Sequence, residues 1–283
     1  GTDRSVAMIA TVDHRGSPRS VVGRKRDYIS HSAITTYQQC PLRYRFKYVD
    51  GLPETVVSSA LIFGGAIHSA LEFHFTELLC GNEPPSLDQL LDVFQEAWRG
   101  RAKDYEDIRF GKGEDHNSLS ALADRMLTAF RESPAVTSDD TVIGIEQELR
   151  GELIPGVPDL LARIDLLTTT SDALVITDFK TARSRWSQGQ AENSSSQLLL
   201  YSELARRLMP DRDVRLRFLV LTKTKKPTVE SFDVDVSQHR VHRITKAVEH
   251  TWRAIQAGHF YPAPSPMNCP TCPFRSECNA WTG

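Results

Sequence analysis

Two aspartates and a lysine stand in otherwise apolar runs near the middle of this 283-residue chain. Asp165 lies in the run LLARIDLL, and Asp178 and Lys180 lie in ALVITDFKTA, which follows the turn-like stretch TTTSD. Side chains two residues apart on a β-strand share one face, so Asp178 and Lys180 would point to the same side of a sheet. The turn would place Asp165 across from them on an adjacent antiparallel strand.

This pattern of residue types indicates a particular chemistry. Two neighbouring carboxylates repel each other unless a cation lies between them. Hard oxygen ligands with open coordination positions suit Mg²⁺ or Mn²⁺, and a substrate phosphate would complete the shell. With a lysine beside them to orient or deprotonate water, the three residues indicate metal-assisted hydrolysis of a phosphodiester. The alternative is structural, because so short a motif is also compatible with strand-end acids paired to Arg163 or Arg183.

Hydrophobic periodicity predicts the elements that position these residues. We expect helices at 31–40, 60–79, 86–102, 117–133, 195–208 and 237–258, buried strands within 141–182, and a strand pair at 213–236. This order predicts an α/β fold with a helical insertion at about residues 80–135. Residues 1–27 are an N-terminal extension with a hairpin expected at 5–24, to which we assign no role.

The composition is that of an ordinary globular protein, with 40% hydrophobic and 25% charged residues. The net charge of −2 provides no global basic field, so a nucleic acid would have to be held by local patches. No apolar run approaches the roughly 20 residues of a membrane span, and the start has no signal-peptide pattern. We therefore expect a cytoplasmic protein, with no membrane partner, whose five cysteines do not form a disulfide framework.

Asp165 followed by Asp178-Phe179-Lys180 resembles the signature of the PD-(D/E)XK nucleases. The surrounding RID and DFKTA are similar to the RecB-type branch of that superfamily. Asp159 follows a literal proline, but Asp165 fits the strand–turn–strand spacing better. The resemblance implies a restriction-endonuclease-like core, a central mixed sheet flanked by helices, in a nuclease domain spanning residues 28–283.

Three further motifs fit the same branch. GGAIHSALE holds His68, with Glu72 one turn later, whereas His74 lies away from the helical face of His68. QLLLYSEL holds Gln197 and Tyr201, which lie four apart and so share one helix face. An acid is also common on the strand before the core, and either Glu146 or Glu148 would fill that position.

The resemblance also implies a role for each residue. It implies that Lys180 positions or activates water, and that Gln197 and Tyr201 arrange the substrate or the lysine. The expected ligands of one or two Mg²⁺ or Mn²⁺ ions are His68, Asp165, Asp178 and the backbone carbonyl of Phe179.

Three cysteines, Cys269, Cys272 and Cys278, are clustered in CPTCPFRSEC near the end of the chain. Three thiolates in so short a run suit a soft metal or a cluster, and Cys40 is the natural fourth ligand. The arrangement resembles the iron–sulfur staple of AddB-type and CRISPR-adaptation nucleases, which implies a [4Fe–4S] cluster in a tail (262–283) that closes onto Cys40. Zinc is the alternative, because the spacing does not distinguish the two well. Cys80 is not expected to be a ligand.

The resemblance therefore implies a Mg²⁺- or Mn²⁺-dependent deoxyribonuclease, an exonuclease acting on single strands or DNA ends in repair, recombination or CRISPR-type processing. Basic residues that would track phosphates are Arg43, Arg45, Lys47, Lys223, Lys225 and Lys226. Tyr44, Phe46 and Tyr48 would either stack on bases or pack against the core. The alternative is a DNA-binding module that does not cut, or an accessory subunit of a helicase–nuclease or integrase complex.

Overall fold

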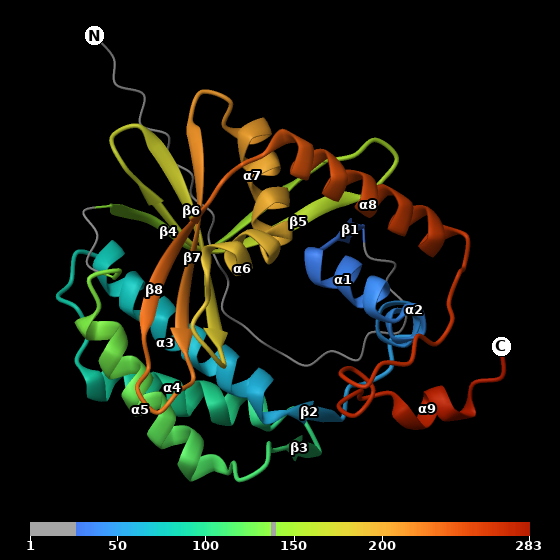
Figure 1. Cartoon of the computed structure of the whole chain (residues 1–283), viewed down its shortest axis with the longest axis horizontal. Coiled ribbons are helices and arrows are strands. Elements are labelled where there is room, and N and C mark those ends of the chain that lie inside the picture. Colours follow the sequence, from blue (N-terminus) through green and yellow to red (C-terminus); the bar gives the residue numbers. More distant parts are fainter. Residues whose placement is uncertain (1–26, 137–139) are drawn as a thin grey trace.

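The computed structural model describes residues 27–136 and 140–283, so the hairpin expected at 5–24 lies outside the described part. A six-stranded mixed sheet forms its centre (Figure 1). Neighbouring strands run in the order β1-β5-β6-β7-β8, and β4 also pairs with β5. The strands are β1 (Tyr28–Ile29), β4 (Thr141–Gly151), β5 (Asp159–Thr169), β6 (Ala173–Ala182), β7 (Asp213–Thr222) and β8 (Val229–Val234).

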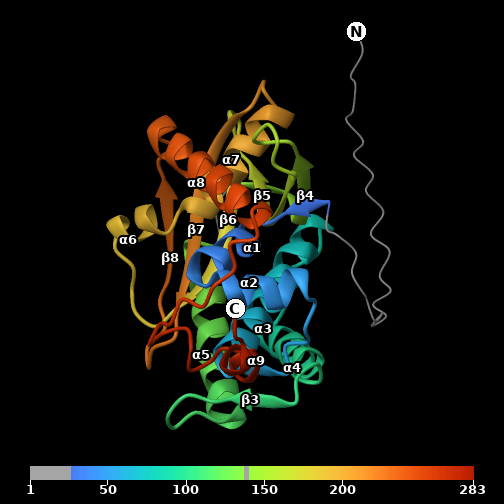
Figure 2. The same ribbon diagram turned by 90° about the vertical axis from the view of Figure 1, so that its right-hand side faces the viewer.

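The sheet is covered by helices on both faces, which explains why its central strands are apolar along most of their length. On one face, α7 (Ser196–Leu208) and α8 (Gln238–Gln256) pack against alternate residues of the strands. On the other face lie α3 (Ser59–Leu79), α4 (Leu87–Ala102) and α5 (His116–Glu132). Figure 2 shows the two groups of helices on opposite sides. The expected restriction-endonuclease-like α/β architecture is confirmed.

The helices between α3 and β4 have clear sequence origins. Ser86 and Gln89 form a capping box at the start of α4. Leu90, Phe94 and Trp98 then recur every four residues and bury one face of α4 in the core beside α3. Two short strands that the sequence did not predict, β2 (Val56–Ser58) and β3 (Asp107–Arg109), pair in parallel near the ends of these helices.

The two ends of the described chain meet beside the sheet. The first helix, α1 (His31–Gln39), ends before Cys40 as expected, but the chain then continues as α2 (Pro41–Tyr44) and a wide turn, η1 (Arg45–Val49). Tyr44 packs with Tyr37, and Phe46 packs with Phe274 just before α9 (Arg275–Ala280). Both aromatic side chains are therefore buried and serve packing rather than presenting a free stacking surface. The sequence also missed the short helix α6 (Gln188–Asn193).

Candidate active site

The candidate site lies where β5 and β6 stop pairing. Their antiparallel ladder ends at the pair Leu166 and Thr177, one position before Asp165 and Asp178. Beyond this point the Oδ2 atom of Asp165 accepts a hydrogen bond of 2.7 Å from the backbone N–H of Phe179. The structure thus brings the two aspartates to facing positions on adjacent antiparallel strands. At this place the Asp165 side chain, and not the backbone of β5, accepts the hydrogen bond from β6.

Asp178 and Lys180 share one face of β6, as their spacing predicts. The Nζ atom of Lys180 lies 2.6 Å from Oδ2 of Asp178. Burial raises the pKa of the Asp178 carboxyl to about 6, although the charge of Lys180 lowers it. Burial likewise raises the pKa of the Asp165 carboxyl to about 6, against the hydrogen bond from Phe179. When either carboxylate is ionised, the nearby positive charge and hydrogen-bond donors therefore do not fully offset the cost of its burial.

His68 projects from the middle of α3 towards the same acids. Its Nδ1 atom lies 3.9 Å from Oδ2 of Asp165. Burial lowers the pKa of His68 to about 4, and the positive charge of Lys180 lowers it further while Asp178 opposes the shift. The imidazole is therefore neutral at pH 7, which is the form that coordinates metals. His74, by contrast, is buried between the rings of Phe75 and Phe130.

Gln197 and Tyr201 approach the site from α7. The Nε2 atom of Gln197 donates a hydrogen bond of 3.1 Å to the Tyr201 hydroxyl. Burial raises the pKa of Tyr201, and the charges of Asp178 and Asp165 raise it further. Helix α7 packs against both β5 and β6, the strands that carry these acids. The sequence had placed these two side chains on one helix face, and the structure directs that face at the acids.

Glu146, rather than Glu148, is the acid of β4 that faces the candidate site. It lies at the register position facing Asp165, between the pairs Ile145–Leu166 and Gln147–Ile164. Among the described residues it alone combines a side chain with a positive φ, 49°, a conformation that commonly marks functional positions. Burial raises the pKa of Glu146, and the neighbouring charge of Glu72 raises it further.

The family comparison agrees with this geometry. The model of the PD-(D/E)XK nuclease superfamily matches residues 28–279. The chain belongs to the PD-(D/E)XK nuclease superfamily.

A solved structure shows the same fold. A crystal structure from Eubacterium rectale, named "Putative exonuclease", aligns over 90% of this chain and 88% of that chain, with 13% identity and a TM-score of 0.59. At this identity the likeness shows the fold alone. The structure of SSO0001 aligns over 88% of this chain and 95% of that chain at 15% identity, but its TM-score of 0.34 is too low to indicate a shared fold. No curated protein sequence matches the chain.

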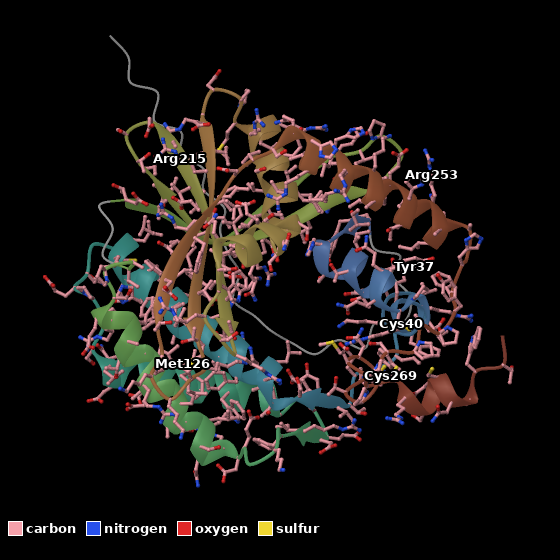
Figure 3. The ribbon with its side chains drawn as sticks, in the orientation of Figure 1. Tyr37, Cys40, Met126, Arg215, Arg253 and Cys269 are labelled. Carbon is pink, nitrogen blue, oxygen red and sulfur yellow. The ribbon has the colours of Figure 1, made fainter. Side chains whose placement is uncertain are left out.

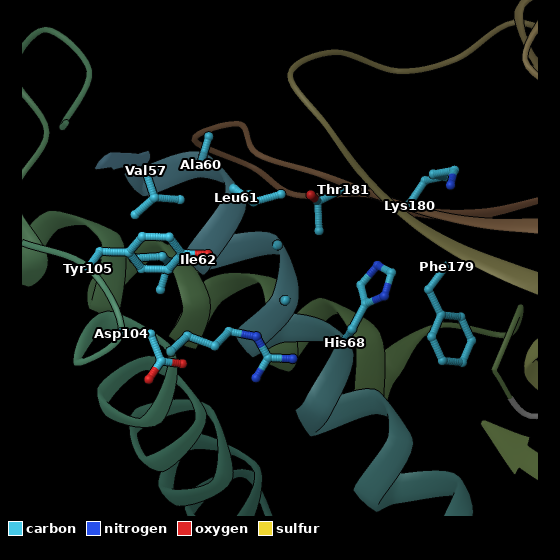
Figure 4. Close-up of a pocket in the computed structure, with 13 residues that line it drawn as sticks. Val57, Ala60, Leu61, Ile62, His68, Asp104, Tyr105, Phe179, Lys180 and Thr181 are labelled. Carbon is cyan, nitrogen blue, oxygen red and sulfur yellow. The ribbon is translucent and has the colours of Figure 1, made fainter. Parts of the chain in front are cut away.

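A cavity of about 480 Å³ opens beside the acids of this superfamily member. His68, Phe179 and Lys180 line one end, and Val57 and Tyr105 line the other (Figure 4). The wall between them is the N-terminal half of α3, and Arg101 of α4, Asp104 just beyond α4 and Thr181 of β6 complete the lining. A substrate group in this cavity would therefore lie against His68 and Lys180.

PD-(D/E)XK nucleases generally use divalent metal ions. Within the described ranges, no group of three or more His, Cys, Asp or Glu side chains is arranged to hold one. Lys180 and the Phe179 N–H occupy the oxygens that a metal would take from Asp178 and Asp165. The donor types, two carboxylates and a neutral imidazole, nevertheless fit Mg²⁺ or Mn²⁺.

His31 is a partly buried histidine next to α7 to which the sequence analysis gave no role. Its Nε2 atom lies 3.1 Å from Oγ of Ser196, at the start of α7. Burial lowers the pKa of His31 to about 4, and the charge of Lys180 lowers it further. No local pattern marks this histidine, because its place depends on the packing of α1 against the sheet.

Three of the four expected cluster cysteines pack together where the two ends of the described chain meet, but within the described ranges they are not arranged as a group that could hold a metal ion. Cys40, Cys272 and Cys278 pack around Leu42, Phe46 and Phe274. Burial raises the pKa of the Cys278 thiol, and the other three thiols raise it further. Figure 3 shows Cys40 and Cys269 in this region. All five cysteines are free, and Cys80 is exposed at the end of α3.

The basic residues that were predicted to contact phosphates differ in whether acids already pair with them. Lys47 lies 2.6 Å from Glu54, which also lies 3.9 Å from Arg43. Arg45 lies 3.3 Å from Asp50, so this group is largely paired with acids. Lys225 and Lys226 are exposed in the turn between β7 and β8, while burial lowers the pKa of Lys223.

None of the helices in the described part of the chain has the length and apolar character of a membrane span.

Proposed function

We propose that the chain is a Mg²⁺- or Mn²⁺-dependent deoxyribonuclease of the RecB type that degrades DNA from single-stranded regions or ends. The observation that carries this proposal is the convergence of Asp165, Asp178, Lys180 and His68 where β5 and β6 separate. The name of the Eubacterium rectale structure adds support for exonuclease over endonuclease activity.

Each of these side chains has its own role in the proposed reaction. Asp165, Asp178 and neutral His68 would hold the metal, together with the Phe179 carbonyl, and Asp178 would release Lys180 when it does so. Once bound, the ion supplies Lewis acidity for the charge that develops on the phosphate and the leaving 3′ oxygen. Lys180, freed from its ion pair, would position or activate the attacking water. Tyr201, fixed by Gln197, would hold the substrate or the lysine in place.

The proposal includes a helicase or integrase partner that opens duplexes, in repair, recombination or CRISPR-type processing. Lys225 and Lys226, exposed beyond β7, would contact phosphates outside the site.

We further propose a [4Fe–4S] cluster held by Cys40, Cys269, Cys272 and Cys278. The packing of Cys40 with Cys272 and Cys278, which lie far from it in sequence, supports it. When bound, the cluster would fasten the C-terminal tail to α2 and so close a very long loop. Anaerobically purified protein should absorb near ~400 nm if iron–sulfur is present. A colourless protein that contains one zinc per chain would assign the site to zinc instead.

The nuclease proposal is tested with end-labelled single-stranded and duplex DNA in Mg²⁺, Mn²⁺ or EDTA. Metal-dependent cutting should be lost in Asp178→Ala and Lys180→Ala and retained in Asp172→Ala, an exposed acid in the turn before β6. The position of the label in the products gives the polarity. If metal-loaded protein binds DNA but cuts nothing, the chain is instead a binding module, or an accessory subunit if a partner restores cutting.

A further inference from the structure

Arg101 lies in the last turn of α4 and reaches over α3 beside the proposed active site. A Cβ atom added to Gly65 would overlap Nε of Arg101 and would lie 3.1 Å from its Cδ and Cζ. The guanidinium therefore rests directly on the helix backbone, and only glycine at position 65 leaves it this space. The neighbouring Gly64 is similarly close to strand β6, where an added Cβ would lie 3.4 Å from Oγ1 of Thr181.

The charge of Arg101 is directed at the catalytic residues but is not neutralised by them. Arg101 lines the same cavity as His68 and Lys180. Burial lowers the pKa of His68 and the charge of Arg101 adds to that shift, whereas burial raises the pKa of Glu72 and the charge of Arg101 opposes that shift. Yet no described residue forms an ion pair or a side-chain hydrogen bond with it, including the exposed Asp104 in the same cavity. The guanidinium is partly exposed in the cavity, and none of its nitrogens is both buried and without a partner, so it is available to bind an anion there.

We infer that Arg101 binds a phosphate of the DNA strand adjacent to the scissile phosphodiester, and that the cavity beside it receives the neighbouring nucleotide. A planar guanidinium suits this role because it can donate two parallel hydrogen bonds to phosphate oxygens. The cavity of about 480 Å³ lies in the size range of small-molecule sites. Tyr105 and Val57 would contact the sugar or base, while His68 and Lys180 face the phosphate to be cleaved.

This inference rests on the proposed nuclease function, and it is tested with variants that separate charge from packing. Arg101→Gln keeps most of the aliphatic stem and removes the charge. Arg99→Gln is the matched control, because Arg99 lies on the same helix end, is exposed and does not line the cavity. Loss of a charged hydrogen bond predicts a fall in kcat/KM on single-stranded DNA of about tenfold to a hundredfold for Arg101→Gln. Arg99→Gln should match the wild type, and Arg101→Lys should recover part of the loss.

A salt titration distinguishes a phosphate contact from a structural role. Removing one phosphate contact to a single strand should reduce the slope of log K against log salt by about 0.7. Binding of labelled single-stranded DNA is measured in EDTA, so that this readout does not depend on cleavage. Circular dichroism checks that each variant is folded.

Gly65→Ala tests the position of Arg101 without changing Arg101 itself, because the added methyl group would displace the guanidinium. Gly65→Ala should lose activity as Arg101→Gln does, and the double variant should lose no more than either alone. If the wild type cuts DNA while Arg101→Gln matches it in rate, affinity and salt slope, the inference is wrong. If the wild type cuts nothing, the proposed function fails, and the affinity and salt slope in EDTA still decide whether Arg101 binds DNA.

Discussion

Replacing Asp178 by asparagine should stabilise the metal-free protein, and should do so more strongly at high pH. Folding raises the pKa of this carboxyl from 3.8 to about 6, chiefly by burial. The folded state therefore binds the proton more tightly than the unfolded state does. The free energy of unfolding consequently falls as the pH rises from about 4 to about 6, and the loss persists above that range.

The size of the effect follows from the shift. At about 1.4 kcal/mol per pKa unit, the ionised Asp178 costs the folded protein up to about 3 kcal/mol at pH 7.5. At pH 5 the same linkage gives only about 1.6 kcal/mol, because much of the carboxyl is still protonated in the folded state. The advantage of Asp178→Asn over the wild type should therefore grow by about 1.5 kcal/mol between the two pH values.

Urea unfolding in EDTA at pH 5 and pH 7.5 measures this difference, and any constant effect of the amide cancels in the comparison. Asp172→Asn is the control. Its hydrogen bond with Thr170 lowers the pKa of the Asp172 carboxyl, so its stabilisation is already complete at pH 5 and its gap to the wild type should not change. Adding Mg²⁺ should stabilise the wild type more than Asp178→Asn, because the metal binds the folded site. A gap for Asp178→Asn that is equal at both pH values would refute the raised pKa.

Three further substitutions test other parts of the structure by urea unfolding. Ser86→Ala removes the N-cap of α4 and should lower the free energy of unfolding by about 1 kcal/mol; Ser86→Thr should lose less. Tyr201→Phe removes the hydrogen bond from Gln197 and should cost about 1 kcal/mol while it slows cleavage of DNA. Glu146→Asn should raise the free energy of unfolding by about 1 kcal/mol, because asparagine tolerates positive φ better than glutamate does. An unchanged midpoint in any of the three would contradict its contact or conformation.

The parts of the fold that depend on local pattern were predictable from the sequence. The capping box at Ser86, the apolar spacing of α4 and the strand–turn–strand around Asp165 and Asp178 each depend on residues close in sequence. The same holds for the shared face of Asp178 and Lys180, since a strand fixes the direction of alternate side chains. In these cases local geometry and tertiary structure agree.

The parts that depend on packing between distant segments were not predictable. Arg101 reaches the cavity from α4, His31 reaches Ser196 from α1, and nothing near them in sequence marks their destination. The choice of Glu146 over Glu148 depends on the pairing of β4 with β5 and on a backbone conformation that the sequence does not reveal. The short pair of β2 and β3 likewise forms only because α3 and α4 bring the two segments together.

The energetics of the site themselves argue for a missing cation. Burial raises the pKa of Asp165 and Asp178, and it also raises that of Glu72 and Glu146. Lys180 lies 2.6 Å from Asp178 and Arg163 lies 3.5 Å from Glu146, so these two cations face a cluster of four acids. Acids that are ionised without a partner lower the stability of the metal-free fold, and a divalent ion would offset that cost. The position where β5 and β6 separate therefore combines a rigid support, provided by the pairing of β6 with β7 through Ala182, with carboxylates whose remaining charge a divalent ion would neutralise.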